Sequence, residues 1–250
     1  MAPSASSASA VAALLVFDCD RDGPRLAIPR PEVQLVVRFG PSAEGGLDVY
    51  AFGPRQRVHR KLIRSGQRSV TARLRLGAPD AVLGVPASAM AGRIVALEDL
   101  WGAAATRRLR ARLADARDMA DAAAILESAI AERLATTNER HAHAELAVAA
   151  ASRLTSASVN AVAVDLGVSE RHLRRVFRET IGVSPKAFAK LTRFRRALSA
   201  ARESADVSWA NIAAAAGYYD QAHLIAEFRT IAGATPRALL SELRSAPSVG

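Results

Sequence analysis

Two stretches decide the fold of the C-terminal half of this chain: GVSERHLRRVFRETIGVSP at residues 167–185 and GYYDQAHLIAEFRTIAGATP at residues 217–236. The second stretch repeats the pattern of the first 51 residues later. The matching pairs are Ser169 and Asp220, His172 and His223, Leu173 and Leu224, Phe177 and Phe228, Arg178 and Arg229, Gly182 and Gly233, and Pro185 and Pro236. The repeat predicts two copies of one small structural unit.

Each stretch follows a short apolar run, from Ser158 to Gly167 in the first copy and from Ser208 to Gly217 in the second. Serine is a preferred N-cap of a helix, and glycine readily takes the left-handed conformation that ends one. After each glycine, a second cap residue precedes apolar positions at a three-to-four-residue period. The sequence therefore predicts helix, tight turn and helix, twice. This is the helix-turn-helix arrangement, whose second helix enters the DNA major groove.

A long helix is predicted between the copies, because Ser184 and Pro185 supply an N-cap and a first-turn proline. Its apolar positions keep helical spacing at Phe188, Leu191, Phe194, Leu198 and Ala201. The prediction is a first helix-turn-helix at about 158–181, a linker helix at about 184–203 and a second helix-turn-helix at about 208–232.

The two turns, the paired His-Leu and Phe-Arg dipeptides and the Gly-x-x-Pro ends resemble the DNA-binding region of AraC/XylS-type transcription regulators over residues 141–244. The resemblance implies a sequence-specific regulator whose two recognition helices read successive major-groove segments, about one turn or ~34 Å apart. It implies double-stranded DNA as the partner, and RNA polymerase as well if the protein is an activator. Cofactors and metal ions are not expected.

Positive charge is concentrated in the first copy. The chain carries a net charge of +10, and residues 171–196 hold nine basic residues against one acid. On a helix, Arg171, Arg174, Arg175 and Arg178 would share the face opposite the apolar stripe. The predicted DNA-contacting residues of this copy are Arg171, Arg174, Arg175, Arg178, Lys186 and Lys190. The alternative is a solvated arginine face.

An arginine in the groove can donate two hydrogen bonds to guanine, which discriminates by ~1–3 kcal/mol, or it can hold phosphate without reading sequence. The residues alone do not divide the four arginines between these roles. Their position in the family motif implies that Arg171, Arg174 and Arg175 face the groove. The same comparison makes Arg178 a phosphate contact, and Lys186 and Lys190 suit the DNA backbone.

The second copy has a different surface, because residues 206–244 carry a net charge of −1. Its groove-facing positions, matched to the first copy, include Gln221, Ala222, Ile225 and Ala226. Gln221 could pair with adenine, and Ala222 or Ile225 could touch a thymine methyl group. We therefore predict an asymmetric reader in which the first half dominates affinity. The alternative is that the second half docks weakly or serves as a scaffold.

The N-terminal half predicts a separate β-rich unit over residues 11–136, preceded by a disordered tail at residues 1–10. Strand-forming runs stand at VQLVVRF (33–39), LDVYAFG (47–53) and SVTARLRL (69–76), and amphipathic helices are expected at about 103–114 and 118–134. A short β-like segment is expected at RIVAL (93–97). The fold class is therefore α+β: a β-rich N-terminal domain with covering helices, then an all-α domain.

No secretion or membrane signal is predicted at the start of the chain. The apolar stretch from Val11 to Phe17 has no basic flank and is far shorter than the ~20 residues that cross a bilayer. A single cysteine, Cys19, forbids an internal disulfide. A cytoplasmic protein without membrane association is expected.

The segment VLGVPASAMAGRIVALEDLWG (82–102) resembles an N-terminal domain of unassigned function that is often fused ahead of AraC-type DNA-binding regions. The resemblance implies binding of a small effector, homodimerisation, or both. Candidate polar groups for an effector are Arg38, Arg55, His59 and Arg73. Residues 55–68 carry six basic residues and no acid, which favours an anionic effector or extra DNA contact; a solvated loop explains the run as well.

Two other functions fit parts of the sequence less well. A DNA-repair methyl acceptor would need a reactive thiol, but Asp18 and Asp20 flank Cys19 and disfavour its thiolate. Neither His172 nor His223 has a carboxylate or cysteine partner at metal spacing. We therefore predict no catalytic residues and no enzyme. A sequence-tolerant architectural protein would gain from charge on both copies, whereas the second copy is nearly neutral.

Overall fold

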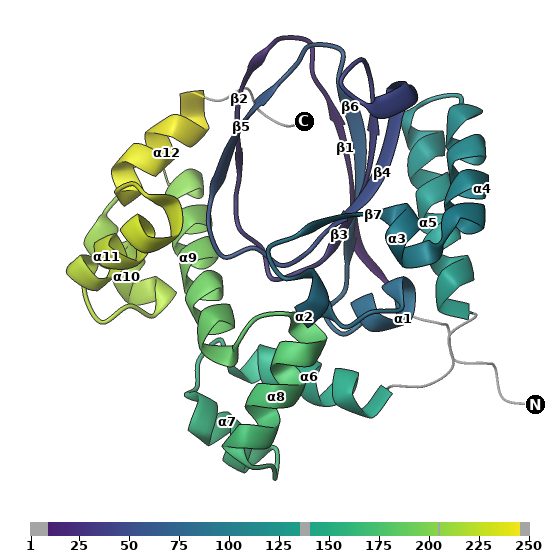
Figure 1. The fold of residues 1–250 in the computed structure, drawn as a ribbon. Helices are drawn as coiled ribbons and strands as arrows, with labels where there is room; N and C mark the ends of the chain where they lie inside the picture. Colours follow the sequence, from purple (N-terminus) through teal and green to yellow (C-terminus); the bar gives the residue numbers. More distant parts are fainter. Residues whose placement is uncertain (1–9, 136–140, 205, 246–250) are drawn as a thin grey trace, which may run out of the picture.

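The computed structural model describes residues 10–135, 141–204 and 206–245, and it has a sheet-rich N-terminal half followed by a helical C-terminal half (Figure 1). The predicted fold class is confirmed. An antiparallel five-stranded sheet has the order β1-β6-β3-β4-β7, and β2 pairs with β5 in a separate ribbon. The strands are β1 (Val11–Asp18), β2 (Gly23–Ala27), β3 (Gln34–Phe39), β4 (Leu47–Phe52), β5 (His59–Ile63), β6 (Arg68–Leu74) and β7 (Ile94–Ala96).

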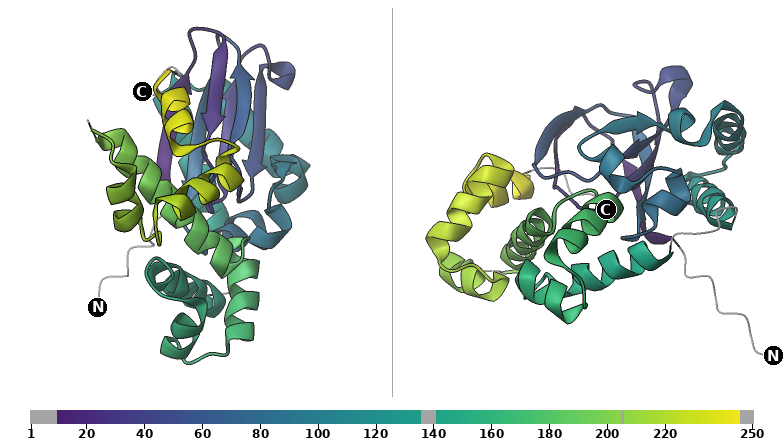
Figure 2. Two further views of the ribbon diagram at one scale, coloured as in Figure 1. Left: turned by 90° about the vertical axis from the view of Figure 1, so that its left-hand side faces the viewer. Right: turned by 60° about the horizontal axis from the view of Figure 1, so that its bottom comes forward.

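One face of the sheet carries the N-terminal core. Alternate residues of β6, namely Val70, Ala72 and Leu74, are fully buried there, because successive side chains of a strand point to opposite faces. Helices α4 (Ala103–Ala114) and α5 (Met119–Ala135) cover this face (Figures 1 and 2). Shorter helical elements complete this half: η1 (Glu44–Gly46), α1 (Pro79–Leu83), α2 (Ala87–Met90) and α3 (Leu97–Trp101).

Three strands were not predicted. β5 lies within the basic run of residues 55–68, so the interpretation of that run as a solvated loop is wrong. β1 and β2 were also missed. The predicted tail is wrong at Ala10, which is buried and whose carbonyl accepts a hydrogen bond from the Arg75 amide at 2.8 Å. Residues 1–9 of that prediction lie outside the described residues.

The C-terminal half contains seven helices in the described residues. They are α6 (His141–Arg153), α7 (Val159–Asp165), α8 (Glu170–Ile181), α9 (Pro185–Glu203), α10 (Trp209–Ala216), α11 (Gln221–Ala232) and α12 (Pro236–Ser245). All five N-caps predicted for the two copies and the linker helix are present: Ser158, Ser169, Ser184, Ser208 and Asp220 each accept a hydrogen bond from the amide three residues on. The helix-turn-helix pairs α7–α8 and α10–α11, here called the first and second units, therefore form as the repeat predicts.

The N-terminal half holds the second unit through the β2–β5 ribbon. The Val58 amide donates to the Ile231 carbonyl at 2.9 Å, where α11 ends. Arg60 of β5 donates to the Ala232 carbonyl at 3.0 Å and to both carboxylate oxygens of Glu242 on α12, at 2.7 and 2.8 Å. These contacts tie one strand of the N-terminal half to two helices of the C-terminal half.

The first unit meets the N-terminal half at Gly182, the residue that ends α8. Gly182 has a φ of 83°, and a Cβ there would lie 2.7 Å from the carbonyl oxygen of Ala87 and 2.7 Å from Pro54 Cγ. Its repeat partner Gly233 has a φ of 67°, but a Cβ at that position would have nothing within 4 Å. Both glycines are required by backbone conformation, and only Gly182 is also required by a close approach.

This difference gives a matched pair of substitutions. Gly233→Ala is expected to cost ~1–2 kcal/mol, the strain of a left-handed alanine. Gly182→Ala is expected to cost at least about twice that, since the methyl group must also displace the backbone at Ala87. Urea unfolding of the two variants measures the difference. Equal losses would contradict the contact between α8 and the N-terminal half.

Candidate nucleic-acid interface

Helix α8 separates an apolar face from a basic face. Ser169 caps its start by accepting a hydrogen bond from the His172 amide at 3.1 Å. The buried side is formed by Leu173, Val176, Phe177 and Ile181. Four exposed arginines occupy the other side: Arg171, Arg174, Arg175 and Arg178. The structure therefore brings all four arginines predicted for the first unit onto one solvent-facing surface.

Two of these arginines have weak partners on their own helix. Arg174 Nε lies 2.7 Å from Glu170 Oε1, and Arg175 Nη1 lies 3.2 Å from Glu179 Oε2. Exposed pairs of this kind contribute ~0–1 kcal/mol, so an anionic ligand can displace either carboxylate. The side chains of Arg171 and Arg178 make no hydrogen bond or ion pair with a described residue. All four guanidinium groups can therefore turn to a polyanion.

The basic residues of α9 are divided between surface and interior. Lys186 is exposed and Lys190 half-buried near the start of the helix. Arg193 instead pairs with Glu227 at 3.1 Å, and Arg195 with Glu32 of the N-terminal half at 3.5 Å. The positive charge counted over residues 171–196 therefore overstates the charge available to DNA, because two of its arginines face internal carboxylates.

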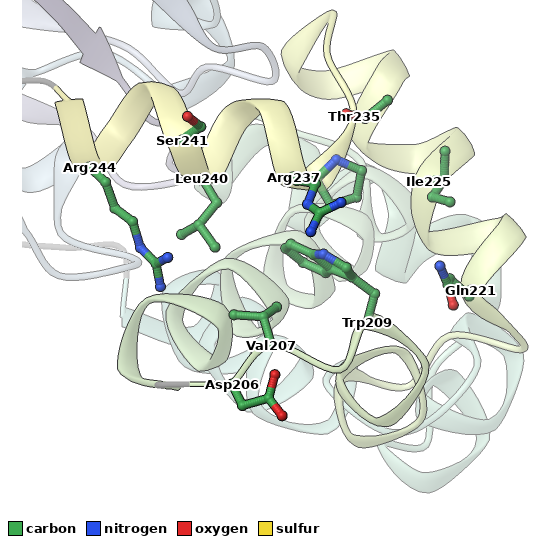
Figure 3. A pocket seen from close by; sticks show the side chains of 11 residues that line it. Asp206, Val207, Trp209, Gln221, Ile225, Thr235, Arg237, Leu240, Ser241 and Arg244 are labelled. Carbon is green, nitrogen blue, oxygen red and sulfur yellow. The ribbon is translucent and has the colours of Figure 1, made fainter.

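Helix α11 presents Gln221, Ala222 and Ala226 to solvent, with Ile225 half-buried. Beside it lies a surface groove of about 810 Å³ between the start of α10, α11 and α12. Figure 3 shows Gln221 and Ile225 lining this groove from α11.

The opposite wall of the groove belongs to α12 and α10. Arg237 and Arg244 of α12 line it together with Trp209 of α10 (Figure 3). Sequence reasoning counted these two arginines in the charge of the second copy but did not place them at the interface. Arg237 and Arg244 are seven residues apart, and this spacing places two side chains on the same face of a helix, which could have indicated their shared position.

Two of the four acids of residues 206–244, Glu227 and Glu242, pair with arginines that lie outside this segment. Glu227 is 5% exposed and accepts hydrogen bonds from Arg193 at 3.1 Å and from the Tyr218 hydroxyl at 2.8 Å. Burial, followed by the charge of Glu227, raises the pKa of Tyr218. Glu242 pairs with Arg60, and Asp220 caps α11. The net charge of −1 is therefore not the charge that DNA would meet on this surface.

His172 and His223 lie beside other rings, and the Cys19 thiol makes a hydrogen bond to the backbone. The His172 ring lies 6.3 Å from that of His143, and the His223 ring lies 5.3 Å from that of Tyr218. Cys19 is buried, and its thiol donates to the Arg21 carbonyl at 3.0 Å. Within the described ranges, no group of three or more His, Cys, Asp or Glu side chains could hold a metal ion. None of the helices in those ranges is both long and apolar enough to cross a membrane.

The four polar residues proposed for an effector are not gathered at one place. Arg38 pairs with Asp48 and lies over the Tyr50 ring, and Arg55 lies 3.9 Å from the centre of the Phe52 ring. His59 is exposed at the start of β5.

Arg73 belongs to a second basic cluster, at the junction with α9. Burial, then the charges of Arg195 and Arg73, lower the pKa of Arg30 to about 10 in this cluster. Arg38 and Arg55 therefore lie beside β3 and β4, His59 at the start of β5, and Arg73 between the sheet and the linker helix.

Comparison with known proteins finds a family match in the C-terminal half. Residues 162–242 match the family model of a helix-turn-helix domain. A search of the curated proteins found no match.

Several solved structures are similar to the chain. A transcriptional regulator from Chromobacterium violaceum, described by its AraC-type DNA-binding domain, is 25% identical over 44% of this chain and 100% of its own, with a TM-score of 0.37. The DNA-binding domain of AdpA in complex with a target DNA is 26% identical over 41% of this chain and 93% of its own, with a TM-score of 0.36. Fatty-acid-bound ToxT from Vibrio cholerae is 11% identical over 91% of this chain and 94% of its own, with a TM-score of 0.47.

The matched segment contains α8 and α11 complete, with the linker helix α9 between them. Residues 162–242 of this chain therefore match a helix-turn-helix domain family over the segment that holds both predicted recognition helices.

Proposed function

We propose that the protein is a sequence-specific transcription regulator that places α8 and α11 in successive major-groove segments of double-stranded DNA. The observation that carries this proposal is the basic outer face of α8. Helix α11 occupies the matching place in the second unit, but its outer face is not basic. The linker helix α9 has 19 residues and so extends about 28 Å. This length is close to the ~34 Å of one DNA turn.

The two units would have different roles in DNA binding. Arg171, Arg174 and Arg175 read bases from the first unit, while Arg178 with Lys186 and Lys190 holds phosphates. In the second unit, the uncharged side chains of Gln221, Ala222 and Ile225 read bases. Arg237 and Arg244, on the far wall of the groove beside α11, add backbone contacts there. Affinity then comes mainly from the first unit, and the second unit adds specificity.

The N-terminal half would act as an effector-binding or dimerisation unit over residues 11–136, with residues 141–244 as the DNA reader. Its contacts reach the first unit at Gly182, the linker helix at Arg195 and the second unit at Ala232. Any change in the sheet or the ribbon therefore acts on the relative orientation of α8 and α11. We infer that the N-terminal half regulates DNA binding through these contacts.

Fluorescence anisotropy tests the DNA-binding proposal. The purified chain is titrated against the promoter region of its own gene neighbourhood and against scrambled duplex of equal length, at several salt concentrations. We expect a preference of roughly 10³ or more for the native fragment. Affinity for DNA should also fall steeply as the salt concentration rises, because binding releases counterions from the phosphates and this release is less favourable at high salt. Equal affinity for both duplexes would refute sequence-specific binding and favour an architectural role.

A further inference from the structure

We propose that Tyr219, in the turn between α10 and α11, holds a DNA phosphate through its hydroxyl at the edge of the major groove; this rests on the proposed function. The proposal starts from a difference between the two copies of the repeat. Ser158 matches Ser208 at an offset of 50 residues, whereas Ser169 matches Asp220 at an offset of 51. The turn of the second unit is therefore one residue longer than the turn of the first.

Backbone hydrogen bonds identify the extra residue as Tyr219. In the first turn the Val168 amide donates to the Ala163 carbonyl at 3.0 Å, and in the second the Tyr218 amide donates to the Ala213 carbonyl at 2.9 Å. Tyr218 therefore takes the place of Val168. The next residue of the first unit is already the N-cap of α8, whereas in the second unit Tyr219 stands before the N-cap of α11.

The two tyrosines of this turn have different surroundings. Tyr218 is 5% exposed, and its hydroxyl donates to Glu227 at 2.8 Å. Tyr219 is 93% exposed, and its side chain makes no hydrogen bond or ion pair with a described residue. The packing of the second unit therefore does not use the Tyr219 side chain. Since lone exposed side chains are common on protein surfaces, the position of Tyr219 has to indicate its role.

Tyr219 lies between the two helices of the second unit, α10 (ending at Ala216) and α11 (beginning at Gln221). In a helix-turn-helix bound to DNA, the first helix crosses the DNA backbone, and the N-terminal residues of the second helix contact base edges in the major groove. The turn that joins them passes from the backbone into the groove. In the proposed complex, Tyr219 therefore lies at the edge of the groove, beside the phosphates.

A phenol has the chemistry that this position needs. Its hydroxyl donates one hydrogen bond, and tyrosine is among the side chains that bind phosphate oxygens and so fix the register of a protein on DNA. The neighbouring Asp220 carries a negative charge, which would repel a phosphate. Its carboxylate caps α11 by accepting a hydrogen bond from the His223 amide at 2.7 Å, so the positive end of the helix dipole offsets part of that charge.

Tyr219 differs from the other phosphate contacts proposed for the two units, because all of those are arginines or lysines. A charged side chain that neutralises a phosphate releases counterions, so each such contact steepens the fall of affinity with salt. A hydroxyl neutralises no charge. Loss of the Tyr219 contact should therefore lower the affinity for DNA and leave its salt dependence unchanged.

Tyr219→Phe removes only the hydroxyl oxygen, and anisotropy titration against the preferred DNA fragment measures the effect. We expect affinity to fall by about fivefold or more, because a hydrogen bond to a charged group is lost. The slope of log affinity against log salt should stay the same, whereas Arg237→Gln, at a charged contact proposed for the same unit, should reduce it by about one. Tyr50→Phe removes the same atom from β4 of the N-terminal half and should leave DNA binding unchanged.

Unchanged affinity of the Tyr219→Phe variant would overturn the assignment, and a loss seen only with Tyr219→Ala would assign the contact to the ring instead of the hydroxyl. The midpoint of urea unfolding should be the same for Tyr219→Phe and the unsubstituted chain, because the side chain is exposed. The titration of the unsubstituted chain tests the proposed function separately. DNA binding that Tyr219→Phe leaves intact removes the role of Tyr219 alone.

Fluorine NMR gives a second measurement that does not depend on affinity. The chain contains three tyrosines, Tyr50, Tyr218 and Tyr219, so labelling with 3-fluorotyrosine gives few resonances. The resonance that disappears in Tyr219→Phe belongs to Tyr219. We expect saturating target duplex to shift this resonance while that of Tyr50 stays in place. A Tyr219 resonance that DNA does not move would refute the contact, even if the variant bound DNA more weakly.

Discussion

Replacing Arg174 and Arg175 together by alanine is expected to weaken binding to the preferred DNA fragment by about 100-fold or more. Each bidentate contact between arginine and guanine discriminates by ~1–3 kcal/mol, and 1.4 kcal/mol corresponds to about tenfold in affinity. Both side chains are exposed, and their partners, Glu170, Glu179 and His172, all belong to their own helix. Anisotropy titration at one fixed salt concentration measures the change.

The double variant Arg107→Ala/Arg108→Ala is the matched control, because it removes the same charge from two exposed positions of α4. It should bind DNA nearly as the unsubstituted chain does. Loss of Arg174 and Arg175 should change the free energy of unfolding by less than ~1 kcal/mol per ion pair, so weaker binding cannot be ascribed to unfolding. If the Arg174→Ala/Arg175→Ala variant kept its affinity while Gln221→Ala abolished binding, the dominance of the first unit would be wrong.

Glu227→Ala is expected to lower the free energy of unfolding of the second unit by about 2–4 kcal/mol. The carboxylate is 5% exposed, and the Arg193 side chain that it neutralises is 29% exposed. Its removal leaves a half-buried guanidinium without its counter-charge and the Tyr218 hydroxyl without its acceptor. Urea unfolding followed by tryptophan fluorescence detects the loss, because Trp209 packs 6.1 Å from Phe228.

The first unit supplies a comparison, since Val176 occupies the position that matches Glu227 and is fully buried. Replacing the whole ion pair by apolar residues, as in Glu227→Leu/Arg193→Met, should recover most of the stability that Glu227→Ala loses. Glu227→Ala with unchanged stability would show that the buried pair contributes nothing. A double variant as unstable as Glu227→Ala would show that the loss does not come from the unpaired charge.

The helix-turn-helix units could be predicted because their signals are local. A cap residue bonds to an amide three residues away, and an apolar stripe repeats within one helix, so Ser169 and the spacing of Leu173 and Phe177 already indicate α8 and its buried face. The exposed arginines follow from the same period. Strands were predicted where alternation was clear, as in β6 of the sheet, and missed where it was not, as in β5 of the ribbon.

Sequence by itself thus determined the two units, their caps, the linker helix and the basic face of α8. Tertiary structure alone decided which charged side chains pair across the fold. Arg193 and Glu227 are 34 residues apart, Arg195 and Glu32 are 163 apart, and Arg60 and Glu242 are 182 apart. A groove lined by β5 and α4 likewise brings together residues that are far apart in the sequence. Such pairs depend on how separate elements pack, and neither periodicity nor capping within one element carries that information.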